Sequence, residues 1–252
     1  CASSNNSMID AFNYIRLGVC PAVVTGGSEA AIYEAGVGGF NALHAMSTRN
    51  DDPATASRPY DKDRDGFVLG EGGAAIILED LEHAKARGAK IYAEVIGGGM
   101  SSDAHHITAP HPEGLGAELC MRYALQDAGI GPADIDYINT HGTSTPIGDP
   151  QEVKAIQRLF GEHAYRLNIS ATKSMTGHLL GGAGAVEGVA AIMAVHTDTV
   201  APTINHFTDD PEIDPKLNFT FNKAQQRTVN AAMSNTFGFG GHNTAVIFRK
   251  YR

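Results

Sequence analysis

Apolar residues recur along the chain with two periods, one typical of helices and one of buried strands. Ile9, Phe12 and Ile15 follow one another at helical spacing, and Gly18 then stops the pattern. Shorter apolar runs bounded by glycine and polar residues predict strands. For the first part of the chain we expect a helix at 8–17, a strand at 22–27, a helix at 30–46, a strand at 74–78, a helix at 80–87 and a strand at 91–96 that runs into three glycines.

The second half of the chain alternates more regularly between the two periods. Its pattern predicts helices at 114–127, 149–160 and 182–195, and strands at 135–140, 167–171, 231–235 and 244–248. Helices and strands that alternate at these lengths indicate an α/β protein with a largely parallel sheet covered on both faces. No linker or low-complexity tract separates domains.

The segment 49–73 is polar and contains acidic residues at alternate positions before Gly66. Asp61, Asp63 and Asp65 resemble the start of a calcium loop, but the twelfth position of such a loop falls on Gly72 instead of a bidentate glutamate. The sequence therefore predicts a solvated turn here.

Composition and charge exclude several classes of protein. The chain has 252 residues, 42% of them hydrophobic, and a formal net charge of −9, which disfavours general binding to nucleic acids. No apolar run is expected to reach membrane length, even at 179–195, so no membrane partner is predicted. Three cysteines without a framework spacing indicate a reducing compartment and a cytoplasmic protein.

Candidate chemistry lies at the first residue and at three strand ends. Cys1 leads into a helix, whose N-terminal dipole favours a thiolate, although a small buried hydrophobic role is the more ordinary one for cysteine. The strands ending near 140, 171 and 235 run directly into segments rich in histidine, lysine and glycine. Parallel α/β sheets place their sites at such carboxyl ends.

Four motifs together resemble one enzyme family. They are Cys-Ala-Ser-Ser at 1–4, His-Gly-Thr-x-Thr-Pro-x-Gly-Asp at 141–149, Thr-Lys-Ser-x-x-Gly-His at 172–178 and Asn-Thr-Phe-Gly-Phe-Gly-Gly-x-Asn at 235–243. In this order they are similar to the β-ketoacyl-acyl carrier protein synthases of the elongating type II kind. The resemblance runs over the whole chain.

The resemblance implies a thiolase-like αβαβα layered sandwich, here lacking much of its N-terminal half because family members carry a substantial segment before the nucleophile. It divides the chain into 1–88, the remainder of the first half, and 89–252, the second half. It also implies a homodimer, an acyl carrier protein partner and no cofactor, since the substrates are carried on phosphopantetheine. The implied reaction is the decarboxylative Claisen condensation of fatty acid biosynthesis.

Roles for individual residues follow from the same resemblance. Cys1, His141 and His178 match the family's catalytic triad, with Lys173 supporting the histidines electrostatically and Glu187 orienting Lys173. Chemically, a thiolate suits acyl transfer, and two imidazole N–H donors suit a developing oxyanion. The resemblance implies no metal.

Further residues match the family's gating and substrate-binding positions. Phe239, flanked by Gly238 and Gly240, is expected to act as a gate and to offer a backbone N–H to an oxyanion together with Cys1, while Asp103 latches a second mobile loop. The expected substrate contacts are Thr143, Thr145, Phe237 and Thr108.

A carrier protein is acidic, so docking on this acidic chain needs a local basic patch. Arg49, Arg58, Lys62 and Arg64 form a candidate cluster, and an ordinary solvated loop is an equally good interpretation of them.

Three other interpretations fit part of the sequence. An N-terminal-nucleophile hydrolase would use Cys1 but leaves His141 and His178 without a role, and its antiparallel four-layer fold does not match the α/β pattern. A non-catalytic partner subunit of a polyketide synthase typically lacks the nucleophile. A polyketide synthase ketosynthase domain stays open on the motifs alone.

Overall fold

The computed structural model describes residues 1–252, and its centre is a sheet of five strands. The first and last strands of the second half of the chain are neighbours in it, so the sheet is assembled from both ends of that half. The strand order is β3 (Glu94–Ser102), β9 (His242–Arg249), β8 (Ala231–Gly238), β4 (Tyr137–Asn139) and β5 (Asn168–Ser170).

Strand pairing in this sheet is mixed. The pairs β8–β4 and β4–β5 are parallel, whereas β3–β9 and β9–β8 are antiparallel. The prediction of a largely parallel sheet is therefore wrong for half of the pairs. The reason is the connection: β8 and β9 are joined by a tight glycine turn, which can only produce an antiparallel hairpin.

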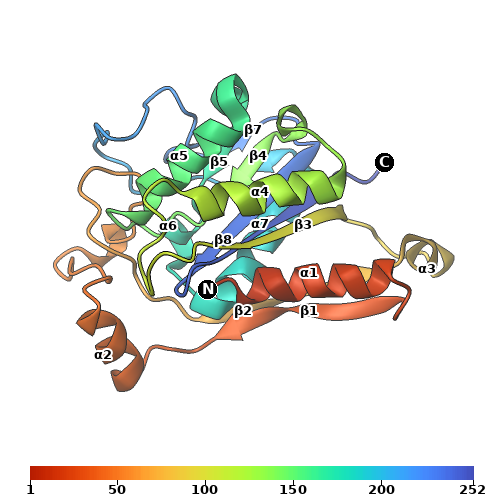
Figure 1. Ribbon diagram of the computed structural model, residues 1–252, viewed down its shortest axis with the longest axis horizontal. Helices are drawn as coiled ribbons and strands as arrows, with labels where there is room; N and C mark the ends of the chain where they lie inside the picture. Colours follow the sequence, from red (N-terminus) through yellow and green to blue (C-terminus); the bar gives the residue numbers. More distant parts are fainter.

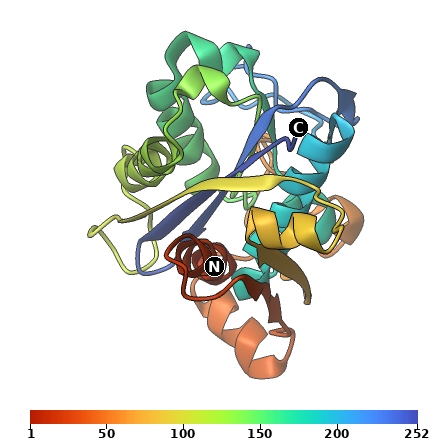
Figure 2. The ribbon, with the colours of Figure 1, turned by 90° about the vertical axis from the view of Figure 1, so that its right-hand side faces the viewer.

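Helices cover both faces of the sheet, as Figures 1 and 2 show. On one face lie α4 (Leu115–Ala128) and α5 (Gly148–Phe160), whose apolar residues form a core of 23 buried residues with the sheet. On the other face lie α1 (Ser3–Arg16) and α7 (Ala183–Thr197), which form a second core of 12 buried residues. The α/β class and the covered sheet are confirmed.

Beyond α1 lies a second, smaller sheet (Figure 1). It consists of β1 (Ala22–Glu29) and β2 (Gly72–Glu79), paired antiparallel in full register. Ile76 points into the second core, whereas Val24 and Ile77 on the outer face are 73% and 65% exposed. The order is thus helix, sheet, helix, sheet, which gives four layers of a thiolase-like sandwich. The division into 1–88 and 89–252 stays a prediction.

The remaining α-helices and strands are short: α2 (Glu34–Ala42), α3 (Leu81–Ala86), α6 (Lys173–Thr176), β6 (Thr199–Val200) and β7 (Gln225–Gln226). The helix expected at 30–46 is thus cut to nine residues. None of its residues is buried, and it projects from the body of the protein in Figure 1. Five of its nine residues are glycine or alanine, and only the partly buried Val37 and Phe40 pack against a small core cluster, so the helix receives little stabilisation.

One helical stretch, Leu180–Thr197, is long and apolar enough by composition to cross a membrane, with mean hydropathy 1.3 over 18 residues. The expectation that no run reaches this length is therefore wrong. In the structure 56% of the stretch is buried, and α7 packs against β8, β2 and α1. These contacts are those of a core helix.

The three glycines expected to follow a strand at 91–96 instead lie inside β3. An ideal Cβ on Gly99 would lie 2.0 Å from the Cys120 carbonyl oxygen of α4, and one on Gly98 would lie 2.7 Å from Ile9 of α1. Because these glycines have no side chains, β3 can pass closely between α4 on one face of the sheet and α1 on the other. The strand then delivers the loop that begins at Asp103.

This close packing predicts the effect of adding one methyl group. We expect Gly99→Ala to lower the free energy of unfolding by about 1–3 kcal/mol, because the backbone of α4 must move away. Gly39→Ala is the control, since its Cβ meets nothing within 4 Å. Urea unfolding monitored by circular dichroism gives both values, and equal values for the two variants would contradict the packing argument.

Candidate active site

Cys1 lies at the electropositive N-terminal end of α1, which two side chains fix in place. Asn5 Nδ2 donates to the Ser234 carbonyl of β8 at 3.1 Å, and Ser4 Oγ donates to the Gly181 carbonyl in the turn before α7. The start of α1 is thereby hydrogen-bonded to β8 and to the turn before α7, which follows His178. The position of the sulfur follows from these ties.

The structure brings Cys1, His141 and His178 together. His178 Nε2 lies 3.1 Å from Cys1 Sγ, and the nearest ligand-type atoms of all three side chains lie within 4.8 Å of one another. The two imidazole rings have centroids 5.1 Å apart and are nearly perpendicular, at 85°. The expected spatial convergence is present, whereas the catalytic roles of these residues stay predictions.

Hydrogen bonding and burial fix the state of the imidazoles. The Leu180 N–H donates to His178 Nδ1 at 3.3 Å, so Nδ1 is an acceptor and the ring proton resides on Nε2, facing Cys1 Sγ. Burial lowers the pKa of both His141 and His178 well below the usual value, and the Lys173 cation lowers both further. Both rings are therefore neutral at neutral pH, and the N–H of His178 that faces Cys1 is on Nε2.

A buried ion pair lies behind the histidines. Lys173 Nζ, at the start of α6, contacts Glu187 Oε1 on α7, and the side chains are 1% and 2% exposed. Burial raises the pKa of Glu187 to about 7, against the opposing effect of Lys173. Neither side chain lines the cavity beside Cys1, and the electrostatic role expected of Lys173 stays a prediction.

Sequence reasoning missed a second buried carboxylate, Glu152 of α5. Glu152 Oε1 accepts from the His141 N–H at 3.0 Å, and Oε2 accepts from the Gly142 N–H at 2.9 Å. Asn235 Nδ2 of β8 adds a bond of 3.3 Å to Oε1. Glu152 thus fixes the backbone that carries His141. Burial raises its pKa to about 7 despite these donors.

A cavity of about 340 Å³ opens beside Cys1. Its wall combines apolar side chains, among them Phe67 and Leu180, with the polar groups of the site. The sequence-predicted residues that line it are Cys1, Asp103, Thr108, His141, Thr143, Thr145, His178, Phe237, Gly238 and Phe239. Gly240, Lys173 and Glu187 do not line it.

Two threonines form a hydroxyl pair on the cavity wall. Thr143 Oγ1 and Thr145 Oγ1 lie 3.0 Å apart, and Thr145 Oγ1 also accepts from the Gly148 N–H at 3.2 Å. Both follow β4 directly, on the loop that carries His141. The pair can donate to and accept from an elongated polar ligand that reaches Cys1 from outside.

Phe239 occupies the tip of the β8–β9 hairpin. Its side chain is 40% exposed, and its ring centroid lies 6.4 Å from that of Phe40 in α2. Gly240 and Gly241 follow with φ of +87° and +79°, a conformation that favours glycine. The hinge expected beside the aromatic ring therefore has the backbone freedom that it needs, and its movement stays a prediction.

Asp103 connects the second loop to this hairpin. Its Oδ1 accepts from Asn243 Nδ2 at 2.9 Å, and the Gly240 N–H donates to the Ile107 carbonyl at 2.7 Å. An ideal Cβ on Gly116 would lie 1.9 Å from Asp103 Oδ1, so α4 leaves room only for a glycine there. Sequence reasoning identified Asp103 but not its partners Asn243 and Gly116.

The candidate docking cluster is not a cationic surface. Arg58 and Arg64 are 6% and 7% exposed, and both guanidinium groups are committed to internal acceptors. Of the four residues only Lys62 is fully exposed. The basic-patch hypothesis is therefore wrong for this cluster.

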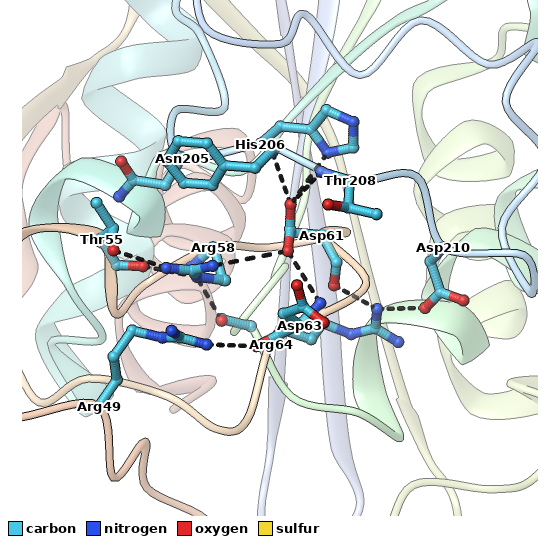
Figure 3. Close-up of polar contacts among 12 residues, drawn as sticks. Arg49, Thr55, Arg58, Asp61, Asp63, Arg64, Asn205, His206, Thr208 and Asp210 are labelled. Carbon is cyan, nitrogen blue, oxygen red and sulfur yellow. Dashed lines mark hydrogen bonds and ion pairs between the residues drawn. The ribbon is translucent and has the colours of Figure 1, made fainter. Parts of the chain in front are cut away.

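The predicted solvated turn at 61–66 is also wrong. Asp61 is 0% exposed, and its Oδ2 accepts from the Phe207 and Thr208 N–H groups at 2.7 and 2.8 Å (Figure 3). Burial alone would raise the pKa of Asp61, but these donors, the Asp63 N–H and Arg58 lower it overall. Asp61, the first of the alternating acidic residues, is thus part of a buried structural junction.

One thiol and two imidazoles within 4.8 Å are also the donor types of a zinc site. His178 Nδ1 already accepts a backbone N–H, so only Nε2 could face such an ion. The expectation that the site has no metal stays a prediction.

The layered fold and the sulfur–imidazole site together define a thiolase-like protein. A family profile described as "Beta-ketoacyl synthase, N-terminal domain" matches residues 1–84, and one described as "Beta-ketoacyl synthase, C-terminal domain" matches residues 92–207. The chain belongs to the β-ketoacyl synthase family.

Curated relatives and solved structures agree with this assignment. The chain is 52% identical over its whole length to 3-oxoacyl-[acyl-carrier-protein] synthase 2 of Synechocystis sp. and 51% identical to that of Staphylococcus aureus, and spans 60% of each. It superposes on all of its length with a Burkholderia phymatum β-ketoacyl synthase (TM-score 0.94, 42% identity, 60% of that chain). A type II polyketide synthase ketosynthase, solved in complex with its acyl-carrier protein, matches likewise (TM-score 0.97, 37% identity, 61% of that chain).

The raised pKa of Glu152 predicts how stability depends on pH. The unfolded carboxyl ionises near 4.5 and the folded one near 7, so the free energy of unfolding falls as pH rises through this window. We expect Glu152→Gln to flatten this decline, measured by urea unfolding at pH 5, 6 and 7. The exposed Glu212→Gln should keep the parent profile. A Glu152→Gln profile parallel to that of the parent would contradict the prediction.

Proposed function

We propose that the protein is a condensing enzyme of fatty acid biosynthesis, which joins malonyl-acyl carrier protein to an acyl chain held on Cys1. The single observation that carries the proposal is the approach of two neutral imidazoles to one half-buried sulfur at the start of a helix. The 52% identity to a relative named for this activity supports the choice of substrates.

In the first half-reaction Cys1 takes the acyl group. Its thiolate attacks the acyl carbon of a pantetheine thioester, the bond from that carbon to the pantetheine sulfur breaks, and the released thiolate takes up the proton that Cys1 gave away. The α1 dipole and the His178 Nε2–H stabilise the attacking thiolate. The backbone N–H groups of Cys1 and Phe239 are the proposed donors to the tetrahedral oxyanion.

In the second half-reaction the malonyl thioester loses carbon dioxide. The C–C bond to the carboxylate breaks, and its electron pair forms an enolate whose oxygen accepts from the Nε2–H groups of His141 and His178. His178 is free to do so because an acylated sulfur no longer carries negative charge. The carbon then attacks the thioester, and Cys1 leaves again as the thiolate.

The remaining parts of the proposal concern partners and setting. The substrates arrive on the phosphopantetheine of an acyl carrier protein, with Thr143 and Thr145 binding the arm, so no separate cofactor is needed. A homodimer and a cytoplasmic location complete the proposal, and three free cysteines support a reducing compartment.

A polyketide synthase ketosynthase is the second candidate, favoured by the TM-score of 0.97 to such an enzyme. Its identity of 37% is lower than the 52% to the fatty acid synthase relative. Product analysis distinguishes them: a fatty acid enzyme condenses fully reduced acyl chains, whereas a polyketide enzyme extends polyketone chains.

Acyl transfer to a single cysteine tests the proposed function directly. After incubation of the full-length protein with an acyl-carrier protein thioester, mass spectrometry should locate one acyl group on Cys1 and none on Cys20 or Cys120. Cys1→Ala should abolish the adduct. An adduct on another residue, or none with a folded protein, would overturn the proposal.

The two histidines predict a separation of the half-reactions. His141→Ala should slow decarboxylation by about 10²–10³, the effect of removing one oxyanion donor. Acylation of Cys1 should change much less, because His178 and not His141 is placed to donate to the sulfur. Carbon dioxide release and thioester formation are measured separately, and equal losses in both would argue against the assignment.

A further inference from the structure

The threonine loop that lines the cavity is clamped by the segment 58–66, which is far away in sequence. The Arg58 N–H donates to Ser144 Oγ at 3.0 Å, and the Gly66 N–H donates to the Ser144 carbonyl at 3.0 Å. Ser144 is fully buried and has a positive φ of 68°, which these bonds hold in place. The Tyr60 N–H adds a bond of 3.1 Å to Asp149 at the end of the loop.

Arg64 is the one side chain of this segment that reaches the loop backbone. Its Nε donates to the Thr145 carbonyl at 3.1 Å, and one terminal nitrogen donates to the Pro146 carbonyl at 3.2 Å. Nε also lies 3.7 Å from Asp149 Oδ2. The guanidinium group thus holds the backbone of Thr145, the second residue of the hydroxyl pair, and of Pro146, which follows it.

The other side of the same guanidinium group is anchored to the protein interior. A terminal nitrogen donates to the Asp61 carbonyl at 2.9 Å and contacts Asp210 (Figure 3). Asp61 in turn binds the backbone of the 207–208 segment. Arg64 therefore connects the threonine loop to a fixed junction of three chain segments, and it is too buried to meet a partner protein.

We propose that Arg64 is a positioning residue that sets the place of Thr143 and Thr145 for the pantetheine arm. The inference rests on the proposed function and names a determinant of how its substrates bind. Five directed N–H groups on a planar frame match these spread acceptors, whereas a lysine ammonium can reach only some of them at once.

The proposal makes a specific kinetic prediction for Arg64→Lys and Arg64→Met in the full-length protein. Because a shifted loop misplaces the arm and not the sulfur, KM for a malonyl thioester should rise about fivefold to tenfold while kcat changes less. The rise should be equal for malonyl-acyl carrier protein and for malonyl-pantetheine, which has no carrier protein. The rate of Cys1 alkylation by iodoacetamide should stay unchanged.

Arg58→Met is the matched control. Arg58 is equally buried in the same cluster, but its side chain binds Thr55 and lies over the Phe207 ring and does not touch the threonine loop. The Arg58→Met variant should have a lower melting temperature than the parent but the same KM for malonyl-acyl carrier protein and for malonyl-pantetheine. Arg64→Lys retains the charge beside Asp149 and Asp210, so it keeps the test available if Arg64→Met does not fold.

Three outcomes would overturn the inference. Unchanged KM values in folded Arg64→Lys would show that the loop keeps its place without the guanidinium group. A rise confined to the carrier-borne substrate would indicate protein docking, and slower alkylation in step with kcat would indicate a general structural effect. Failure of the proposed function is distinguishable, since the parent protein would then release no condensation product from either substrate.

Discussion

The site depends on one contact, that between His178 Nε2 and Cys1 Sγ across 177 positions of sequence. It forms only if the start of α1, the turn before α7 and the end of β8 meet at one point. Ser4 and Asn5 of α1 make that meeting specific, because each bonds a main-chain carbonyl of one of the other two segments. Packing of α1 and α7 against the same sheet face then buries the contact.

Much of the fold follows from patterns within the chain. The apolar periods located seven of the nine strands and most helices, and missed β6 and β7, which have only two residues each. Strand direction was not predictable in the same way, since β9 is as buried as the parallel strands β4 and β5, and only the hairpin turn between β8 and β9 distinguishes the alternatives. The helix around α2 was overestimated because its many small residues satisfy a helical period while providing little buried surface.

In the candidate site, too, some residues could be predicted from the sequence and others could not. Motifs identified the groups that line the cavity, because chemistry demands particular residue types there. Glu152 and Arg64 carry no such signal, since an acidic residue in a helix or an arginine in a polar loop is ordinarily exposed. Their burial depends on backbone N–H and carbonyl groups supplied by the 141–146 loop. Such partners are visible only once the segments lie together, so Asp61 and its neighbours resembled a solvated turn.

The buried charges also distinguish one part of the cavity wall, which they hold in place, from the part around Phe239, where a gate is predicted. Around His141 and Thr145 the loop is bonded on several sides to charged groups that cannot return to water without loss of their partners. Around Phe239 the hairpin is bonded to the Asp103 loop by uncharged backbone groups and by Asn243, the Phe239 side chain is 40% exposed, and two glycines occupy the turn. Under the proposed function, the site admits a long acyl chain and then holds a small reacting group, which requires both properties. Rigid donors around the sulfur, together with the hinge predicted beside Phe239, provide both within a single cavity.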